Sequence, residues 1–140
     1  MKKIMLLLIT LSIFFSCKSQ TKEEVKDSKT VQTEEIVQTK DPIQLLDVAA
    51  FKKGITNPEI QLIDVRTLKE YEGGHIANAT LIDYFSSNFK ETLLTLDKEK
   101  PLYLYCKSGG RSGKASKILA KLGFKEIYDL NGGYKAWKKQ

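Results

Sequence analysis

Histidine and cysteine are nearly absent from this chain of 140 residues, which contains one His and two Cys. A structural or catalytic metal site requires a cluster of such ligands, and His75 with Cys106 does not supply one. We therefore expect no metal and no cofactor. Proline is scarce as well, with three residues, and no internal repeat is visible, so a repeat architecture is not expected.

A hydrophobic run long enough to cross a membrane is also missing. The run Ile4–Phe15 is shorter than a spanning helix and follows Lys2 and Lys3. A basic start and a short apolar segment are typical of a secretory signal. The run ends Phe14-Phe15-Ser16-Cys17, which resembles a bacterial lipobox, although Phe14 stands where leucine is usual. Residues 1–16 are predicted to be a lipoprotein signal peptide, with cleavage of an ordinary signal peptide nearby as the alternative.

Lipidation of Cys17 implies a protein anchored to a bacterial membrane in the cell envelope, outside the cytoplasm and most simply in the periplasm. Residues 17–40 hold mostly Lys, Gln, Thr, Ser and Glu, so we expect a flexible tether there. With Cys17 acylated, Cys106 has no partner for an intramolecular disulfide. A lone thiol in an oxidising compartment needs an external reductant or a chemistry that uses oxidised sulfur.

Basic residues exceed acidic residues only modestly. The formal net charge is +6, and loss of Lys2 and Lys3 with the signal leaves 21 basic residues against 17 acidic ones, or +4. This excess suits a small anionic substrate, and no alternation of aromatic and basic residues indicates nucleic-acid binding. A hydrophobic content of 41% is enough for the core of one domain, which we place at 41–140.

The segment 102–112 is the most informative part of the chain. An apolar run, Leu102–Tyr105, predicts a strand that delivers Cys106 to its carboxyl edge, and a helix is expected to open at Ser112. Glycines in the connecting loop turn backbone N–H groups inward, and the helix start adds positive partial charge. Such a loop binds an anion and favours the thiolate of Cys106. The candidate substrate-binding residues are Lys107, Ser108, Gly109, Gly110, Arg111 and Ser112, with Lys107 and Arg111 as mobile cations at the rim.

Helices and strands alternate along the rest of the domain, which predicts parallel pairing with right-handed crossovers. In such sheets ligands bind beyond the carboxyl ends of the strands, where Cys106 is placed. Thr67 and Glu70 form a capping box, and Ser87 is a candidate helix cap. The expected strands are 61–65, 79–82, 102–105 and 127–130; the expected helices are 48–53, 67–74, one from Ser87 through Leu94, 112–122, and a last one after Gly132-Gly133.

Four ordered motifs together resemble the single-domain rhodaneses. They are Leu62-Ile63-Asp64-Val65-Arg66, then Glu70-Tyr71 leading to Gly74-His75-Ile76-Ala77-Asn78-Ala79, the loop from Tyr105 to Ser112, and the terminal segment Leu130–Trp137. Ala77-Asn78 stands where the family often has Pro-Gly, which we expect to alter a turn only. The resemblance implies an α/β fold with a central parallel sheet of about five strands and helices on both faces.

The resemblance also implies sulfur transfer through a persulfide on Cys106, with residues 107–112 as its cradle. The expected partners are a small anionic sulfur donor such as thiosulfate and a cyanide or thiol acceptor, and the expected state is a monomer. Asp64 and Arg66 correspond to family residues at the edge of the site, and we expect them to be structural. Structural roles are also expected for His75, Tyr134 and Trp137.

Two other functions stay open on the sequence. A cysteine-dependent phosphatase or arsenate reductase also uses a loop from Cys to Arg, but with His before the cysteine and five residues between; here Tyr105 precedes Cys106, and four residues separate it from Arg111. A smaller ring suits a sulfur atom better than a phosphoryl group. The second alternative is a membrane-tethered persulfide carrier, sensor or binding module with little turnover.

Overall fold

A computed structural model describes residues 41–140 of the chain. The predicted signal peptide (1–16), the lipidation site Cys17 and the tether up to residue 40 lie outside the described residues. No helix among residues 41–140 is long and apolar enough to cross a membrane.

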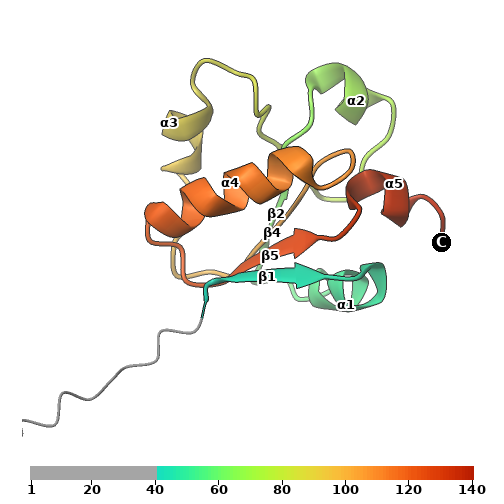
Figure 1. Ribbon diagram of the computed structural model, residues 1–140, viewed down its shortest axis with the longest axis horizontal. Helices are drawn as coiled ribbons and strands as arrows, with labels where there is room; N and C mark the ends of the chain where they lie inside the picture. The colour runs from blue at the N-terminus through green and yellow to red at the C-terminus, as the bar shows by residue number, and fades with distance from the viewer. Residues whose placement is uncertain (1–40) are drawn as a thin grey trace, which may run out of the picture. The chain divides into compact units, whose positions relative to one another are not determined.

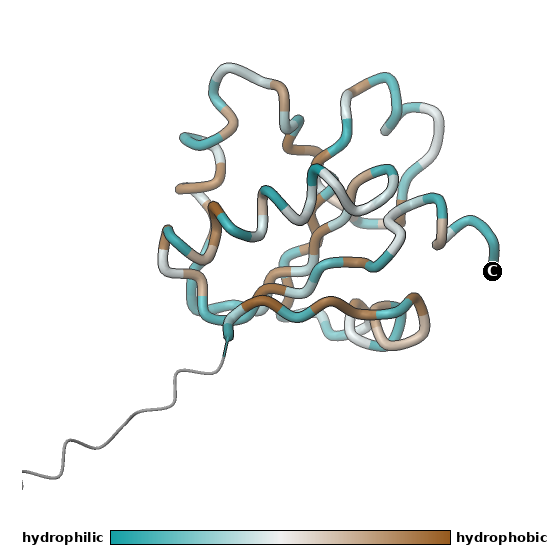
Figure 2. Tube along the Cα trace, viewed as in Figure 1, coloured by the Kyte–Doolittle hydropathy of each residue, from teal (hydrophilic) through white to brown (hydrophobic). Residues whose placement is uncertain are grey.

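The centre of the domain is a sheet of five strands that all run parallel, in the order β1-β5-β4-β2-β3 (Figure 1). β4 lies in the middle, and all four of its residues are buried. Apolar residues follow the strands through the middle of the fold (Figure 2). The strands are β1 Ile43–Leu46, β2 Gln61–Asp64, β3 Thr80–Leu81, β4 Leu102–Tyr105 and β5 Ile127–Leu130.

Five helices connect and cover the strands, and two of them begin elsewhere than expected. α4 begins at Gly110, two residues before the expected Ser112, because Gly109 takes a left-handed conformation and ends the loop there. α3 has Asn88 at its N-cap position, without a side-chain capping hydrogen bond, so the expected cap at Ser87 is wrong. The helices are α1 Val48–Gly54, α2 Leu68–Glu72, α3 Phe89–Leu93, α4 Gly110–Lys121 and α5 Gly133–Trp137.

The core has one apolar cluster on each face of the sheet. On one face, α4 contributes Ala115 and Leu119, four residues apart on one side of the helix, and α3 contributes Phe89 and Leu93. On the other face, the cluster includes Phe51 of α1 together with residues of α5. Helices therefore cover both faces of a parallel sheet, which confirms the predicted α/β architecture (Figure 1).

Candidate active site

Cys106 is the first residue after β4, at the carboxyl edge of the central strand. Its side chain is almost fully buried, with 1% of the residue exposed. Two groups, one in the following loop and one in the first turn of α4, point at the sulfur: the Gly109 N–H donates to Sγ at 3.1 Å, and the Ser112 hydroxyl lies 3.5 Å away. The loop thus closes around the sulfur with its hydrogen-bond donors turned inward.

The surroundings of Cys106 lower the pKa of its thiol below the ordinary value. Burial acts in the opposite direction, because a low dielectric disfavours the charged thiolate. Hydrogen bonds outweigh burial: the Ser112 hydroxyl and the backbone N–H groups of Ser112, Ser108 and Gly109 all favour the thiolate. The direction agrees with the thiolate expected from the sequence; the Ser112 hydroxyl makes the largest favourable contribution, and the three main-chain N–H groups follow it.

Only one of the two loop glycines uses its conformational freedom. Gly109 has φ of +98°, whereas Gly110 is already helical and a Cβ there would meet no other atom. The carbonyl of Gly109 accepts from the N–H of Gly113 at 2.9 Å and from the hydroxyl of Ser112 at 3.2 Å. Gly109 therefore bonds in two directions: its N–H donates to the sulfur, and its carbonyl accepts from the first turn of α4.

The amino end of α5 is bonded to the cysteine loop, a contact that the sequence did not predict. The N–H of Tyr134 donates to the carbonyl of Cys106 at 2.7 Å, and the N–H of Lys135 donates to the carbonyl of Lys107 at 3.0 Å. These are N–H groups of the first turn, which have no partner within their own helix. Gly133 lies so close to the loop that a Cβ would come within 2.7 Å of the Ser108 nitrogen.

Arg111 is not the mobile rim cation that the sequence predicted. Its Nη1 and Nη2 donate to the two carboxylate oxygens of Glu70 at 2.7 and 2.8 Å, and its side chain is 16% exposed. The bond from Arg111, with further donation from Thr67, lowers the pKa of Glu70 to about 2. The capping box of Thr67 and Glu70 forms as predicted, so Glu70 both caps α2 and holds Arg111.

The sequence and the fold both match proteins of one family. The sequence model of the Rhodanese-like domain matches residues 47–140. The chain belongs to the rhodanese-like domain family. Among solved structures, the rhodanese-related protein of Thermoplasma volcanium superposes with a TM-score of 0.61 at 29% identity, over 69% of this chain and 91% of that one.

Two curated relatives of this rhodanese-like domain show how far the likeness extends. The uncharacterized protein YqhL of Bacillus subtilis is 48% identical over 77 residues, which span 55% of this chain and 60% of YqhL. The thiosulfate sulfurtransferase GlpE of Coxiella burnetii is 40% identical over 80 residues, or 57% of this chain and 73% of GlpE. The chain thus spans about three fifths of YqhL and about three quarters of GlpE.

Asp64 and Arg66 of the rhodanese-like domain form a buried pair beside the loop. Arg66 Nη2 donates to Asp64 Oδ2 at 2.6 Å and to the carbonyl of Gly74 at 2.8 Å, and its guanidinium lies 4.1 Å from the ring centre of Tyr134. The pair ties the end of β2 to the segment after α2 and to α5. This geometry fits the structural role expected for both residues. His75, also expected to be structural, stacks on the Tyr71 ring at 3.7 Å.

The sequence did not predict that a carboxylate, that of Asp129, is buried on the face of the sheet that α4 covers. Asp129 of β5 is 3% exposed, and its Oδ1 has no hydrogen-bond partner among the described residues. The hydroxyl of Ser116, one turn after Ser112 on α4, is buried and without a partner in the same part of the chain. Burial raises the pKa of Asp129 to about 6, against smaller opposing hydrogen bonds from Ser112 and the Leu130 N–H.

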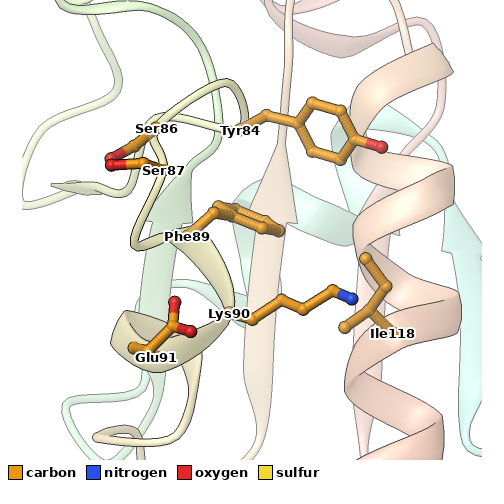
Figure 3. Close-up of a pocket in the computed structure, with 7 residues that line it drawn as sticks. All are labelled: Tyr84, Ser86, Ser87, Phe89, Lys90, Glu91 and Ile118. Atoms are coloured by element: carbon orange, nitrogen blue, oxygen red, sulfur yellow. The ribbon is translucent and has the colours of Figure 1, made fainter.

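Two cavities differ in their relation to Cys106. One of about 380 Å³ lies between the β3–α3 segment and α4, where Tyr84 and Phe89 point toward Ile118 (Figure 3). None of its lining residues belongs to the loop 106–112. A second cavity, of about 220 Å³, is lined in part by Lys107 of the loop and by residues of α5. Within residues 41–140 no three His, Cys, Asp or Glu side chains gather as a metal site would require.

Proposed function

We propose that this rhodanese-like domain is a sulfurtransferase, which moves a sulfane sulfur from a donor such as thiosulfate to a thiol or cyanide through a persulfide on Cys106. The observation that carries the proposal is the sulfur of Cys106 at the end of β4, with the Gly109 N–H at 3.1 Å and a lowered pKa. The likeness to a thiosulfate sulfurtransferase, GlpE, supports thiosulfate as the donor.

The first half-reaction loads the cysteine. The thiolate of Cys106 attacks the outer sulfur of the donor, the sulfur–sulfur bond of the donor breaks, and its electron pair leaves with sulfite. The N–H groups that hold the thiolate remain aimed at the sulfur atoms as charge shifts outward, which stabilises the transition state. Lys107, exposed at the rim, attracts the dianionic donor. Arg111 is held in its ion pair with Glu70.

The second half-reaction regenerates the enzyme. A nucleophile attacks the outer sulfur of the persulfide, the bond to Cys106 Sγ breaks, and the electron pair returns to Sγ as thiolate. The leaving thiolate is the species that the loop already stabilises, so a low pKa at Cys106 serves both halves of the cycle.

Thiocyanate formation from thiosulfate and cyanide, measured on the purified full chain in detergent, tests the proposal. Cys106→Ser is expected to abolish it, and Cys17→Ser, which removes the other cysteine, is the matched control and is expected to retain it. Intact mass after thiosulfate is expected to show one added sulfur. An active Cys106→Ser contradicts the proposal, and added sulfur without turnover supports the persulfide carrier in its place.

We also propose that Cys17 carries lipid and tethers the domain to the cell envelope of a bacterium, outside the cytoplasm. The support is the sequence before it, which ends in a small residue directly ahead of the cysteine. Fractionation of the bacterial cell tests this: the protein is expected with the membranes and Cys17→Ser is expected to leave them. Retention of the variant on the membrane counts against lipid anchoring.

A further inference from the structure

A cluster of lysines surrounds the cavity beside the cysteine loop. The cavity has a volume of about 220 Å³, and Lys107, Lys135 and Lys138 all line it. Lys107 belongs to the loop, and the other two belong to α5 and the turn that follows it. The rest of the lining is Arg66, Glu70, Gly73 and Tyr134.

The charge of this cavity is positive and uncompensated. Arg66 is paired with Asp64, and the one carboxylate of the lining, Glu70, is paired with Arg111. The three lysines are exposed, and none of them takes part in the ion pairs formed within residues 41–140. A concave surface with cations of one sign concentrates small anions at its mouth.

The backbone that carries Lys135 and Lys138 is held at a fixed place relative to Cys106. The N–H groups of Tyr134 and Lys135 bond the loop carbonyls of Cys106 and Lys107, so α5 and the loop form one unit. Lys135 and Lys138 are three residues apart and therefore neighbours on the same side of this turn. Lys138 Nζ also lies 6.0 Å from the ring centre of Tyr134, another residue of the cavity lining.

The cavity suits the second substrate, the sulfur acceptor, better than it suits the donor. A donor such as thiosulfate delivers its sulfur to Sγ within the loop, where the N–H groups meet its charge. The acceptor meets a persulfide in that loop, and Lys107, which belongs both to the loop and to the cavity lining, marks the side on which its remaining atoms would lie. A cavity of about 220 Å³ is below the roughly 300–1,000 Å³ of sites for drug-sized ligands, which favours a small molecule.

We propose that this cavity binds the anionic group of a small thiol acceptor, with Lys135 and Lys138 as its recognition residues; the proposal rests on the sulfur transfer proposed above. The persulfide anion left by loading takes up a proton from water; the acceptor thiolate then attacks the outer sulfur of this Cys106 hydropersulfide, and the bond between that sulfur and Sγ breaks. The electron pair returns to Sγ as thiolate, and the proton stays on the transferred sulfur. The products are the acceptor hydropersulfide and Cys106 thiolate, with no external oxidant or reductant.

The test separates loading from unloading. The full chain in detergent is loaded with thiosulfate, one added sulfur is verified by intact mass, and unloading is followed in a single turnover. The acceptors are 2-mercaptoethanesulfonate, neutral 2-mercaptoethanol and cationic 2-mercaptoethylamine, with rates compared per thiolate. We expect the anionic thiol to react about 10-fold faster than the neutral one at low salt. The advantage is expected to vanish near about 1 M salt, where the screening length falls to about 3 Å.

The variant Lys135→Gln/Lys138→Gln is expected to lose most of the preference for the anionic thiol while reacting normally with the neutral one. Lys114→Gln, an exposed lysine of α4 outside the cavity lining, is the matched control and is expected to keep the preference. Equal rates for anionic and neutral thiols in the unmodified protein overturn the proposal. So does an equal loss for all three thiols in the double variant, which indicates a structural role. Failure to load any sulfur refutes the sulfurtransferase function itself.

Discussion

Gly133 packs against the carbonyl of Cys106 with no room for a side chain between them. Its φ is +58°, and a Cβ there would overlap the Cys106 oxygen and approach the Ser108 nitrogen to 2.7 Å. We expect Gly133→Ala to push α5 away from the loop, lowering the free energy of unfolding by about 1–3 kcal/mol beyond any backbone strain. Gly123→Ala is the control, because Gly123 also has positive φ, +91°, but a Cβ there meets nothing.

Urea unfolding of both variants measures this difference, and thiol alkylation reports the state of the loop. Gly133→Ala is expected to alter the alkylation rate of Cys106, while Gly123→Ala leaves it unchanged. Equal loss of stability in the two variants would show that the contact between α5 and the loop contributes nothing.

The two loop glycines are predicted to differ sharply on substitution. Gly109→Ala places a side chain at φ of +98°, a strain of about 1–3 kcal/mol that tilts the N–H away from the sulfur. Because that N–H favours the thiolate, the pKa of Cys106 is expected to rise and alkylation at neutral pH to slow. Gly110→Ala, in a helical and open position, is expected to leave both unchanged. An unaltered pKa in Gly109→Ala would contradict the role assigned to this N–H.

Much of the fold was predictable because its signals are local. The buried run Leu102–Tyr105 and the spacing of Ala115 and Leu119 each reveal an element without knowledge of its neighbours. β1 was not predicted from its residues, because three of the four are half-buried, Leu45 is exposed, and the strand is fixed by pairing with β5. Its partner lies about eighty residues away along the chain, as the register of Ile43 with Ile127 shows.

At the site, the sequence predicted the cysteine and its loop but not what surrounds them. The order of strand, Cys106, glycines and helix is contiguous, so the inward N–H groups follow from local chemistry. The pairing of Arg111 with Glu70 joins residues 41 positions apart, and the capping box already accounted for Glu70. The close approach of α5 to the cysteine loop depends on Gly133. A glycine at that position indicates a turn, but it does not indicate which segment the turn packs against.

The ion pair of Glu70 with Arg111 is predicted to stabilise the fold in a pH-dependent way. Glu70→Gln keeps a capping-box residue but removes the charge, so we expect a loss of about 1 kcal/mol at pH 7. The pKa of Glu70 is lowered from 4.5 to about 2, so its contribution is complete above about pH 5 and is lost as the pH falls toward 2. Urea unfolding at neutral and acid pH measures this, and the two proteins are expected to converge in acid.

An independent check on the pair comes from the double-mutant cycle with Arg111→Gln. Removing either partner alone leaves the other partly buried without its counter-charge, and removing both avoids that cost. The double variant is therefore expected to be more stable than the sum of the single losses implies. Strict additivity would show that the two side chains do not interact in solution.

Asp129 is predicted to destabilise the fold at neutral pH. Its pKa is raised from 3.8 to about 6 by burial, so the folded state binds its proton more tightly than the unfolded chain, and stability falls as the pH rises through that window. The shift corresponds to a penalty of about 3 kcal/mol above pH 6. Asp129→Asn keeps the shape and removes the charge, so its unfolding free energy is expected to exceed that of the unmodified protein at pH 7.5. At pH 4 the two are expected to agree; a variant less stable at both values would indicate that Asp129 has an ionised partner in the fold.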